Sequence, residues 1–591
     1  MQSGPSPIEW TEDGRPCSAL YGDAYFGADD GLAESRAVFL GGCGLPGAWA
    51  GRRRFTVGEL GFGTGLNILA LLDLWRREGP AGGRLQIFSV EAHLMSREDA
   101  ERALAAWPEL APLAEVLLSC WPETRRGFHR IDLPEFGAVV DLALMDVGDA
   151  LGVWDGRADA WFLDGFAPAL NPGMWREEVL QAVAARSAPG ARAATFTVAG
   201  RVRRGLEAAG FAVRRAPGHG RKRERLEAVL PGTGRDPEAP GAVAVVGAGI
   251  AGAAVRRALL DLGVAPVLFE AETPGAGTSG NPAGLVTPRL DAGLGPVARL
   301  AAQAYLRALD IYASLPGAII SRGVLQLAAS DRDAGRFARI AASDLFPPGA
   351  LQVLDPDAAS ARLGEPVERT GLDQPGALSL DPREVLRAWC GGASTGRVCA
   401  ITPDEGGWRL STAEGGTQAF QAVILAAGAS VSGLWAEAPV LPVRGQASWT
   451  ETAEALRPRA AGWGGYIAPT AGGFLFGATF RRGETSTEVT DEDHRANLEA
   501  LSRVRPGLAG QLAGRSIRGR ASIRATTRDH LPMAGVVPGC PGLRVLGGLG
   551  SRGLTWAPLL AEHVAAGVAG LASPLPQDLA RWVDPGRDSL R

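Results

Sequence analysis

The sequence predicts an α/β protein with two nucleotide-binding domains in series. The prediction rests on two segments, 55–75 and 242–263, each of which runs from a short apolar stretch through a glycine-rich turn into a helix with apolar periodicity. Residues 231–241 (PGTGRDPEAPG) lie between them and have the proline, glycine and charge content of a linker. The expected boundaries are residues 1–232 for the first domain, 233–240 for the linker and 241–591 for the second domain.

Length and composition agree with this division. A chain of 591 residues exceeds what one hydrophobic core usually organises. Its 46% hydrophobic and 21% charged residues are ordinary for a soluble globular protein, so no fibrous or disordered class is favoured. The net charge of −4 argues against a uniformly basic nucleic-acid binder, although a local basic patch remains compatible with it.

Cysteine usage and the N-terminus indicate a cytoplasmic protein. The six cysteines are widely spaced and form no CxxC pair, so neither a disulfide framework nor a metal site is expected. Residues 1–14 lack the basic start and the apolar core of a signal peptide. No apolar run approaches the roughly 18–20 residues of a membrane span.

The first glycine-rich turn follows the strand that contains Glu59 and opens a helix. Its glycines permit a tight turn and a close approach of the backbone to a ligand. They are Gly61, Gly63 and Gly65. Such a turn is by itself a weak indication of nucleotide binding, and the strands that follow strengthen it.

Three further strands are expected at 85–92, 141–150 and 160–165, and each brings an acid to its end. These acids are Glu91, Asp149 and Asp164. Because open α/β sheets bind ligands at the carboxyl edge of their strands, we expect the three acids and Glu59 to line that edge, with Glu91 on ribose hydroxyls. Taken singly, each acid is equally compatible with a helix cap or a loop.

The second glycine-rich turn has the full dinucleotide fingerprint. It comprises Gly247, Gly249 and Gly252, and Glu270 ends the next expected strand 18 residues later. The first glycine makes the turn, the second admits a pyrophosphate and the third lets helix and strand pack closely. Glu270 is expected to bind the adenosine ribose, and an acid there favours a free 2′-hydroxyl.

The first domain resembles class I S-adenosylmethionine methyltransferases, in which an acid precedes the glycines as Glu59 does. More specifically, it resembles the methyltransferase half of the MnmC family of bifunctional enzymes, which complete 5-methylaminomethyl-2-thiouridine at the tRNA wobble position. The blocks that carry this resemblance are 21–40, 58–67, 161–175 and 195–224. The resemblance implies that S-adenosylmethionine is bound by Glu59, Gly61, Gly63, Gly65, Glu91 and Asp149.

The resemblance also implies that Asp164 lies in the catalytic pocket beside the amine to be methylated. An ammonium group has no lone pair, so the carboxylate either takes its proton or only orients the amine. Phe166 is expected to stack on the uracil ring or to shape the pocket, unless it fills the core. Pro168 and Pro172 would stiffen the same segment.

The second domain resembles flavoproteins of the D-amino-acid-oxidase type. The segments that carry the likeness are 278–290, 422–429, 442–446, 524–535 and 545–564, and the terminal blocks 548–555 and 575–587 match the MnmC family. The resemblance implies an α+β substrate subdomain and bound FAD. The implied FAD contacts are Gly247, Gly249, Gly252, Glu270, Ser279, Asn281, Gly548, Gly550, Arg552 and Gly553.

The implied oxidation removes a carboxymethyl group from 5-carboxymethylaminomethyl-2-thiouridine and leaves a primary amine. Arginines can hold the substrate carboxylate bidentately, although such arginines often only form salt bridges. The candidates are Arg444, Arg524 and Arg552. The methyltransferase then acts on the amine that the oxidase has released.

A tRNA substrate needs cations for its phosphates, and basic runs concentrate in the first domain. We expect Arg221, Lys222 and Arg223 to contact the anticodon stem-loop of a tRNA bound by a monomeric enzyme. One alternative is an amino-acid or secondary-amine oxidase fused to a small-molecule methyltransferase. Another is a non-catalytic RNA-binding scaffold. The electron acceptor and the anticodons recognised stay open.

Overall fold

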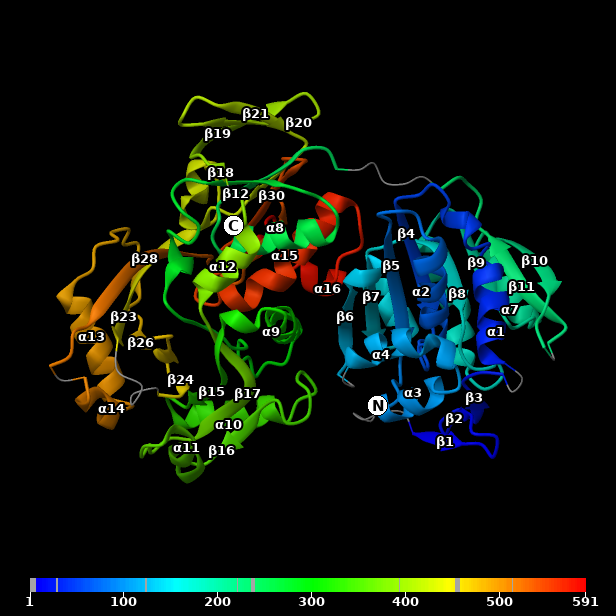
Figure 1. Cartoon of the computed structure of the whole chain (residues 1–591), viewed down its shortest axis with the longest axis horizontal. Coiled ribbons are helices and arrows are strands. Elements are labelled where there is room, and N and C mark those ends of the chain that lie inside the picture. Colours follow the sequence, from blue (N-terminus) through cyan, green and yellow to red (C-terminus); the bar gives the residue numbers. More distant parts are fainter. Residues whose placement is uncertain are drawn as a thin grey trace. The chain divides into compact units, whose positions relative to one another are not determined.

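The computed structural model divides the chain into two compact units. It describes residues 7–27, 30–122, 125–220, 222–234, 240–392, 394–451, 458–512 and 514–590. The first unit comprises residues 1–239 together with 572–577, and the second comprises 240–571 and 578–591 (Figure 1). The inclusion of 572–577 in the first unit was not predicted from the sequence.

The first unit is built on one eight-stranded sheet with the order β10-β11-β9-β8-β4-β5-β7-β6. The five central strands, from β9 to β7, run parallel, and the strands beyond them pair antiparallel. The bounds are β4 Arg54–Leu60, β5 Arg84–Glu91, β6 Gly127–Leu133, β7 Ala138–Leu144, β8 Ala158–Leu163, β9 Ser187–Thr195, β10 Ala212–Pro217 and β11 Glu224–Val229. A small separate sheet joins β1 Ile8–Trp10, β2 Pro16–Ser18 and β3 Asp23–Ala24.

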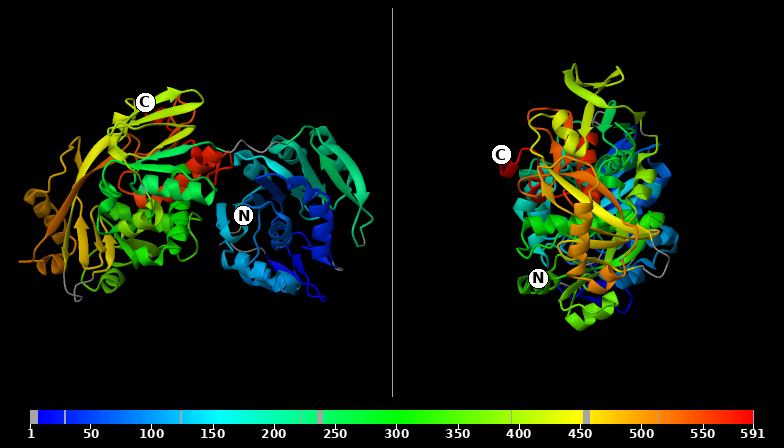
Figure 2. Two further views of the ribbon diagram at one scale, coloured as in Figure 1. Left: turned by 45° about the horizontal axis from the view of Figure 1, so that its top comes forward. Right: turned by 90° about the vertical axis from the view of Figure 1, so that its left-hand side faces the viewer.

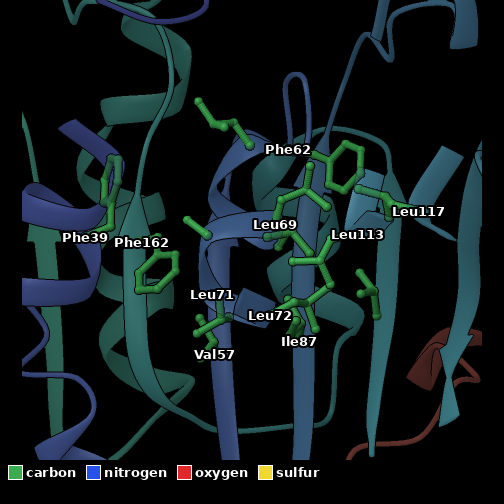
Figure 3. Packing of buried hydrophobic residues seen from close by; sticks show 14 of the residues in the cluster. Phe39, Val57, Phe62, Leu69, Leu71, Leu72, Ile87, Leu113, Leu117 and Phe162 are labelled. Carbon is green, nitrogen blue, oxygen red and sulfur yellow. The ribbon is translucent and has the colours of Figure 1, made fainter. Parts of the chain in front are cut away.

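Helices cover both faces of this sheet, because the parallel strands are apolar on both sides. Side chains of α2 and α4 pack with β4 and β5 on one face, including Leu69, Leu113 and Ile87 (Figure 3). Side chains of α5, α6 and α7 pack on the other face around Trp154 and Trp161. The helices are α1 Gly31–Ser35, α2 Leu66–Glu78, α3 Arg97–Leu104, α4 Ala111–Ser119, α5 Val147–Val153, α6 Glu177–Ala185 and α7 Gly200–Ala208.

The segment Ala572–Gln577 completes the first unit. The side-chain amide of Gln86 donates to the carbonyl of Ala572 at 3.1 Å, and its oxygen accepts from the Ala572 N–H at 3.2 Å. The N–H of Ser573 donates to Asp155 at 2.9 Å. Ala572 and Ser573 are buried, so these bonds satisfy backbone groups that water does not reach.

The second unit contains a six-stranded sheet of the order β18-β13-β12-β22-β30-β29 and a ten-stranded sheet of the order β14-β17-β15-β24-β25-β26-β23-β27, with β16 on β17 and β28 on β23. The first sheet is β12 Val243–Val246, β13 Val267–Glu270, β18 Ser394–Thr395, β22 Ala422–Leu425, β29 Met533–Val536 and β30 Leu543–Gly547. The second is β14 Gly284–Val286, β15 Ile319–Leu327, β16 Gln352–Leu354, β17 Gly371–Leu380, β23 Leu441–Glu451, β24 Ala460–Gly462, β25 Tyr466–Pro469, β26 Gly473–Gly477, β27 Arg481–Arg482 and β28 Arg518–Thr526.

A third sheet of this unit, β19 Val398–Asp404, β20 Gly407–Thr412 and β21 Thr417–Phe420, projects from its rim (Figures 1 and 2). The helices are α8 Ile250–Asp261, α9 Pro296–Ala313, α10 Asp331–Ala341, α11 Pro356–Leu363, α12 Pro382–Cys390, α13 Asp491–Ser502, α14 Pro506–Gly510, α15 Gly553–Ala569 and α16 Gln577–Ala580. The α/β sheet with its helices and the larger, mostly antiparallel sheet are the two parts that the flavoprotein resemblance implies.

Within the described residues, no helix is long and apolar enough to cross a membrane. The same residues contain no group of three histidine, cysteine or acidic side chains placed to hold a metal ion. All six cysteines are free thiols.

The Gln86 contacts predict a local loss of stability. Gln86→Leu keeps the volume but leaves the N–H and C=O of Ala572 buried without partners, which costs about 1–3 kcal/mol. Hydrogen exchange measured by mass spectrometry on the whole chain should show faster exchange in β5 and around Ala572. Gln181→Leu, on the exposed side of α6, is the matched control. Equal exchange in the two variants would contradict the role of this contact.

Candidate cofactor and substrate sites

The first unit has a cavity of about 380 Å³ at the carboxyl ends of β4, β5 and β8. The glycine turn after β4 forms one wall, and the segment around β3 and α1 forms another. The side chains that carry chemical groups into it include Tyr21, Asn67, Glu91, Asp164, Phe166 and Lys222. Parallel strands thus deliver their acids to one edge, as the sequence predicted for Glu91 and Asp164.

The glycine turn requires glycine at its three predicted positions. Gly61, Gly63 and Gly65 have φ values of +93°, +54° and +80°, in the left-handed region that other residues avoid. A Cβ on Gly61 would also lie 3.2 Å from the Asp164 carbonyl. Gly65 immediately precedes α2, so N–H groups at the start of a helix face the cavity.

Glu59 lies beneath this turn and does not line the cavity. It is fully buried in β4, and one carboxyl oxygen accepts from the Ser89 hydroxyl at 2.5 Å. Burial raises the pKa of Glu59 to about 8, and the nearby charge of Asp164 adds to the rise. The raised pKa favours the protonated form of Glu59, whose side chain lies beneath the turn.

Glu91 lines the cavity at the end of β5, and both of its carboxyl oxygens accept backbone hydrogen bonds. The N–H of Gly63 donates to one at 3.1 Å and the N–H of His93 donates to the other at 2.9 Å. Burial raises its pKa, and these hydrogen bonds oppose the rise. The carboxylate is thus fixed beside the glycine turn, where a ribose would lie in the predicted binding mode.

Asp164 follows β8 and is held from two sides. The Asn67 amide donates to one oxygen at 2.8 Å, and the Gly165 N–H donates to the other at 2.8 Å. The Ser35 hydroxyl in turn donates to the Asn67 oxygen at 2.7 Å, which fixes the orientation of the amide. Burial raises the pKa of Asp164 to about 6, while the Asn67 and Gly165 hydrogen bonds oppose the rise.

Aromatic rings surround the carboxylate. Phe166 packs against Tyr21 and Tyr25, with ring centroids 4.9 and 5.1 Å apart. All three line the cavity, so Phe166 shapes the pocket and is not core filling. Neither tyrosine nor Asn67 was among the site residues predicted from the sequence. The tyrosines stand in the block 21–40 that carried the family resemblance, so that block held a usable signal.

The prediction for Asp149 is wrong. The strand ends at Leu144, and Asp149 lies exposed in the first turn of α5, away from the cavity. The acid nearer the strand end is Asp146, whose side chain caps α5 and pairs with Arg176 at 2.6 Å. The segment DVGDA contains two acids, Asp146 and Asp149. Because α5 begins between them, Asp146 lies nearer the strand end and Asp149 lies within the helix.

Lys222 lies at the cavity although it was predicted only as a tRNA contact. Its ammonium is 2.7 Å from a Glu34 oxygen and 4.0 Å from the centroid of the Phe196 ring. Its positive charge lowers the pKa of Asp164. Arg223 is exposed beside it, and Arg221 lies outside the described residues.

The dinucleotide turn of the second unit has the predicted geometry. Gly247 has φ +105°, and a Cβ on Gly252 would lie 1.8 Å from the Gly247 carbonyl. A Cβ on Gly249 would meet the Ser279 hydroxyl at 3.3 Å. Glu270 ends β13 and accepts from the Ala248 N–H at 2.7 Å. Glu270 therefore holds its glycine turn as Glu91 holds the first one.

A cavity of about 900 Å³ adjoins this turn. It is lined by Ser279, Asn281, Gly550, Arg552 and Gly553 among the predicted FAD contacts. The Asn281 side-chain oxygen is buried and accepts no hydrogen bond from any described residue, so it is available to a cofactor. Gly548, with φ +65°, shapes the turn before α15 without lining the cavity. These features fit FAD.

The three arginines predicted to hold the substrate carboxylate differ in whether they line this cavity. Arg444 is 1% exposed, forms an ion pair with the buried Asp493 and donates to the Ser486 carbonyl at 2.9 Å. It does not line the cavity, so its assignment to the substrate is wrong. Arg524 and Arg552 do line the cavity, and so does Tyr466, which lies close enough to Arg524 to interact with it electrostatically.

Comparisons with known protein families assign a different cofactor to each unit. Residues 108–231 match a family of S-adenosyl-L-methionine-dependent methyltransferases, and residues 242–566 match a family of FAD-dependent oxidoreductases. The first unit is thus a methyltransferase domain that uses S-adenosylmethionine, and the second is an FAD-dependent oxidoreductase domain. The methyltransferase sheet begins well before residue 108, at β4.

The similarity extends over the whole chain. The tRNA 5-methylaminomethyl-2-thiouridine biosynthesis bifunctional protein MnmC of Caulobacter sp. (strain K31) is 58% identical over 99% of this chain and 98% of its own length. The protein of the same name from Caulobacter vibrioides is 56% identical over 98% and 97%. Among solved structures, iminodiacetate oxidase from Chelativorans sp. BNC1 aligns with a TM-score of 0.50 and 24% identity, covering 58% of this chain and 98% of that one, and shows the fold of the second unit.

The buried Glu59 predicts a pH dependence of stability. Between pH 4.5, its ordinary pKa, and about 8, the folded chain holds a proton that the unfolded chain has lost. Stability therefore falls as pH rises through this window, by an amount on the order of 5 kcal/mol. Glu59→Gln, which mimics the protonated acid, should remove this part of the pH dependence of Tm. The control is Glu115→Gln, exposed on α4. An unchanged slope in Glu59→Gln would mean that Glu59 is ionised in the folded protein.

Proposed function

The chain belongs to the MnmC family of bifunctional tRNA 5-methylaminomethyl-2-thiouridine biosynthesis proteins, and on that premise we propose that it modifies a tRNA wobble uridine in two steps. The oxidoreductase domain converts 5-carboxymethylaminomethyl-2-thiouridine to 5-aminomethyl-2-thiouridine. The methyltransferase domain then adds a methyl group to the new amine. The near full-length identity of 58% is the observation that carries this proposal.

In the first step, the carbon between the amine and the carboxylate is oxidised. Ser279, Asn281 and the turn at Gly550–Gly553 are the residues that would hold FAD, which when bound would supply the acceptor for the hydride of this carbon. Water hydrolyses the resulting imine and releases glyoxylate and the primary amine. Arg524 is the residue proposed to hold the substrate carboxylate, because its guanidinium lies in the cavity wall beside Tyr466.

In the second step, Asp164 receives the primary amine. S-adenosylmethionine supplies the methyl group and would be held by the turn Gly61–Gly65 and by Glu91. The two hydrogen bonds on Asp164 fix the carboxylate, which positions the amine for in-line transfer. Its raised pKa makes it a better proton acceptor than a solvated aspartate by about two orders of magnitude. We propose that it takes the amine proton.

The rest of the cavity suits a nucleobase. The faces of Tyr21, Tyr25 and Phe166 offer a platform for the uracil ring. Lys222 and the exposed Arg223 supply positive charge near the opening for phosphates of the anticodon loop. We further propose that the enzyme works as a monomer in the cytoplasm, where its tRNA substrate is found.

Nucleoside analysis tests both steps. Purified protein is incubated with tRNA that carries the carboxymethylaminomethyl group, with and without S-adenosylmethionine, and the nucleosides are identified by mass spectrometry. The expected product is the primary amine without the methyl donor and the methylated amine with it. Asp164→Asn should slow methylation by about 10²–10⁴-fold and leave oxidation unchanged.

Three outcomes would count against the proposal. Oxidation of free amino acids with no change in tRNA would favour a small-molecule oxidase fused to a methyltransferase. Methylation at the wild-type rate by Asp164→Asn would remove Asp164 from the chemistry. A colourless protein without a flavin spectrum would favour a scaffold that has lost catalysis.

Arg524 and Arg444 should respond differently to the same change. Arg524→Leu removes a charge-assisted contact to the substrate carboxylate, so kcat/KM for oxidation should fall about 10–100-fold with normal flavin content. Arg444→Leu leaves the buried Asp493 with Arg481 as its one ion-pair partner among the described residues and should lower the free energy of unfolding by about 3 kcal/mol. Oxidation is measured by stopped-flow flavin reduction and stability by denaturant unfolding. If Arg444→Leu slowed oxidation and Arg524→Leu lowered stability, the two roles would be exchanged.

A further inference from the structure

One phenylalanine of the oxidoreductase unit is exposed at its cavity. The unit contains seven phenylalanines, and six of them are buried, with at most 8% of their surface exposed. Phe480 is 51% exposed and lines the 900 Å³ cavity. Core packing therefore does not explain this ring, and a single exposed phenylalanine needs a further observation before it indicates binding.

That observation comes from the next two residues, which form β27. Arg481 is committed to acids, since its guanidinium lies 2.9 Å from Asp493 and 3.0 Å from Glu492. Arg482 instead lies with its guanidinium carbon 5.9 Å from the centroid of the Phe480 ring. It is exposed and makes no ion pair with any residue that the structure describes. An aromatic face and an uncommitted cation thus stand together at the edge of the cavity.

A glycine-containing turn of the same unit also lines this cavity. The turn Trp463–Gly465 lines the cavity between β24 and β25, and a Cβ on Gly464 would meet no atom within 4 Å. Arg524 and Tyr466 line the same cavity. A substrate whose carboxylate reaches Arg524 would therefore occupy the same cavity that Phe480 lines.

We propose that Phe480 is the platform on which the wobble uracil stacks during oxidation, and that Arg482 contacts an adjacent phosphate of the anticodon loop. This inference rests on the proposed function, because it assigns a binding surface for that same substrate. Aromatic side chains accept any base by its face, which suits a nucleotide that has left its loop stack. A small free amino acid would need neither the ring nor the cation.

The test uses the full-length flavoprotein and tRNA that carries the carboxymethylaminomethyl group. The second-order rate constant for flavin reduction should fall about tenfold in Phe480→Ala, as expected when one base stack is lost. Phe480→Leu should be impaired similarly because it keeps apolar area but loses the aromatic face, whereas Phe480→Trp should restore the rate. Flavin content and Tm should match the wild type. Val353→Ala, an exposed apolar residue of β16, is the matched control.

Arg482 is tested by salt dependence. Arg482→Gln should reduce the slope of the logarithm of kcat/KM against the logarithm of salt concentration by about 0.7–0.9, the loss of one phosphate contact. Arg495→Gln, exposed on α13, should leave the slope unchanged.

Full activity in Phe480→Ala would overturn the platform, and full activity in Phe480→Leu would reduce it to an ordinary apolar contact. An unchanged salt slope in Arg482→Gln would remove the phosphate contact. If wild-type protein fails to reduce its flavin with this tRNA, the proposed function fails instead, so the two failures are distinguished.

Discussion

The burial of three carboxyl groups at neighbouring strand ends governs the chemistry of the first unit. Glu59, Glu91 and Asp164 all lose water, and this burial raises the pKa of each carboxyl; the charge of Asp164 adds to the rise at Glu59 and Glu91, and the charge of Glu34 adds to it at Asp164. The rise differs between the acids: burial raises the pKa of Glu59 to about 8, whereas hydrogen bonds from Asn67 and Gly165 limit the rise at Asp164 to about 6. S-adenosylmethionine carries a positive sulfonium charge. Bound at this edge of the sheet, that charge would favour the ionised forms of Glu91 and Asp164, which line the cavity.

Both units hold their glycine turns in the same way. An acid at the end of the second parallel strand accepts a hydrogen bond from a backbone N–H inside the turn, from Gly63 to Glu91 in one unit and from Ala248 to Glu270 in the other. This contact orients the turn before a cofactor arrives. The difference in cofactor then arises from what faces the turn: Asp164 and aromatic rings in the first unit, and Asn281 with the turn before α15 in the second.

Local patterns predicted the features that depend on local geometry. The glycine turns, Glu91, Asp164 and Glu270 follow from a strand that ends in an acid or a turn, which neighbouring residues determine. Arg444 and Asp149 failed because the decisive partners are elsewhere: Asp493 lies 49 residues beyond Arg444, and a helix cap at Asp146 displaces Asp149. Tyr21, Asn67 and Lys222 converge on Asp164 from separate parts of the chain, and no local pattern reports that convergence.

The account depends most on Asp164 being a desolvated base that Asn67 holds in place. Selective carbon-13 labelling of aspartate carboxyls, with the Asp164 signal assigned by its absence from Asp164→Asn, gives its pKa directly. The account predicts a titration near pH 6 in the cofactor-free protein, shifted upward in Asn67→Leu because one stabilising hydrogen bond is lost. A titration near the ordinary value of 3.8, unaffected by the Asn67 change, would contradict it.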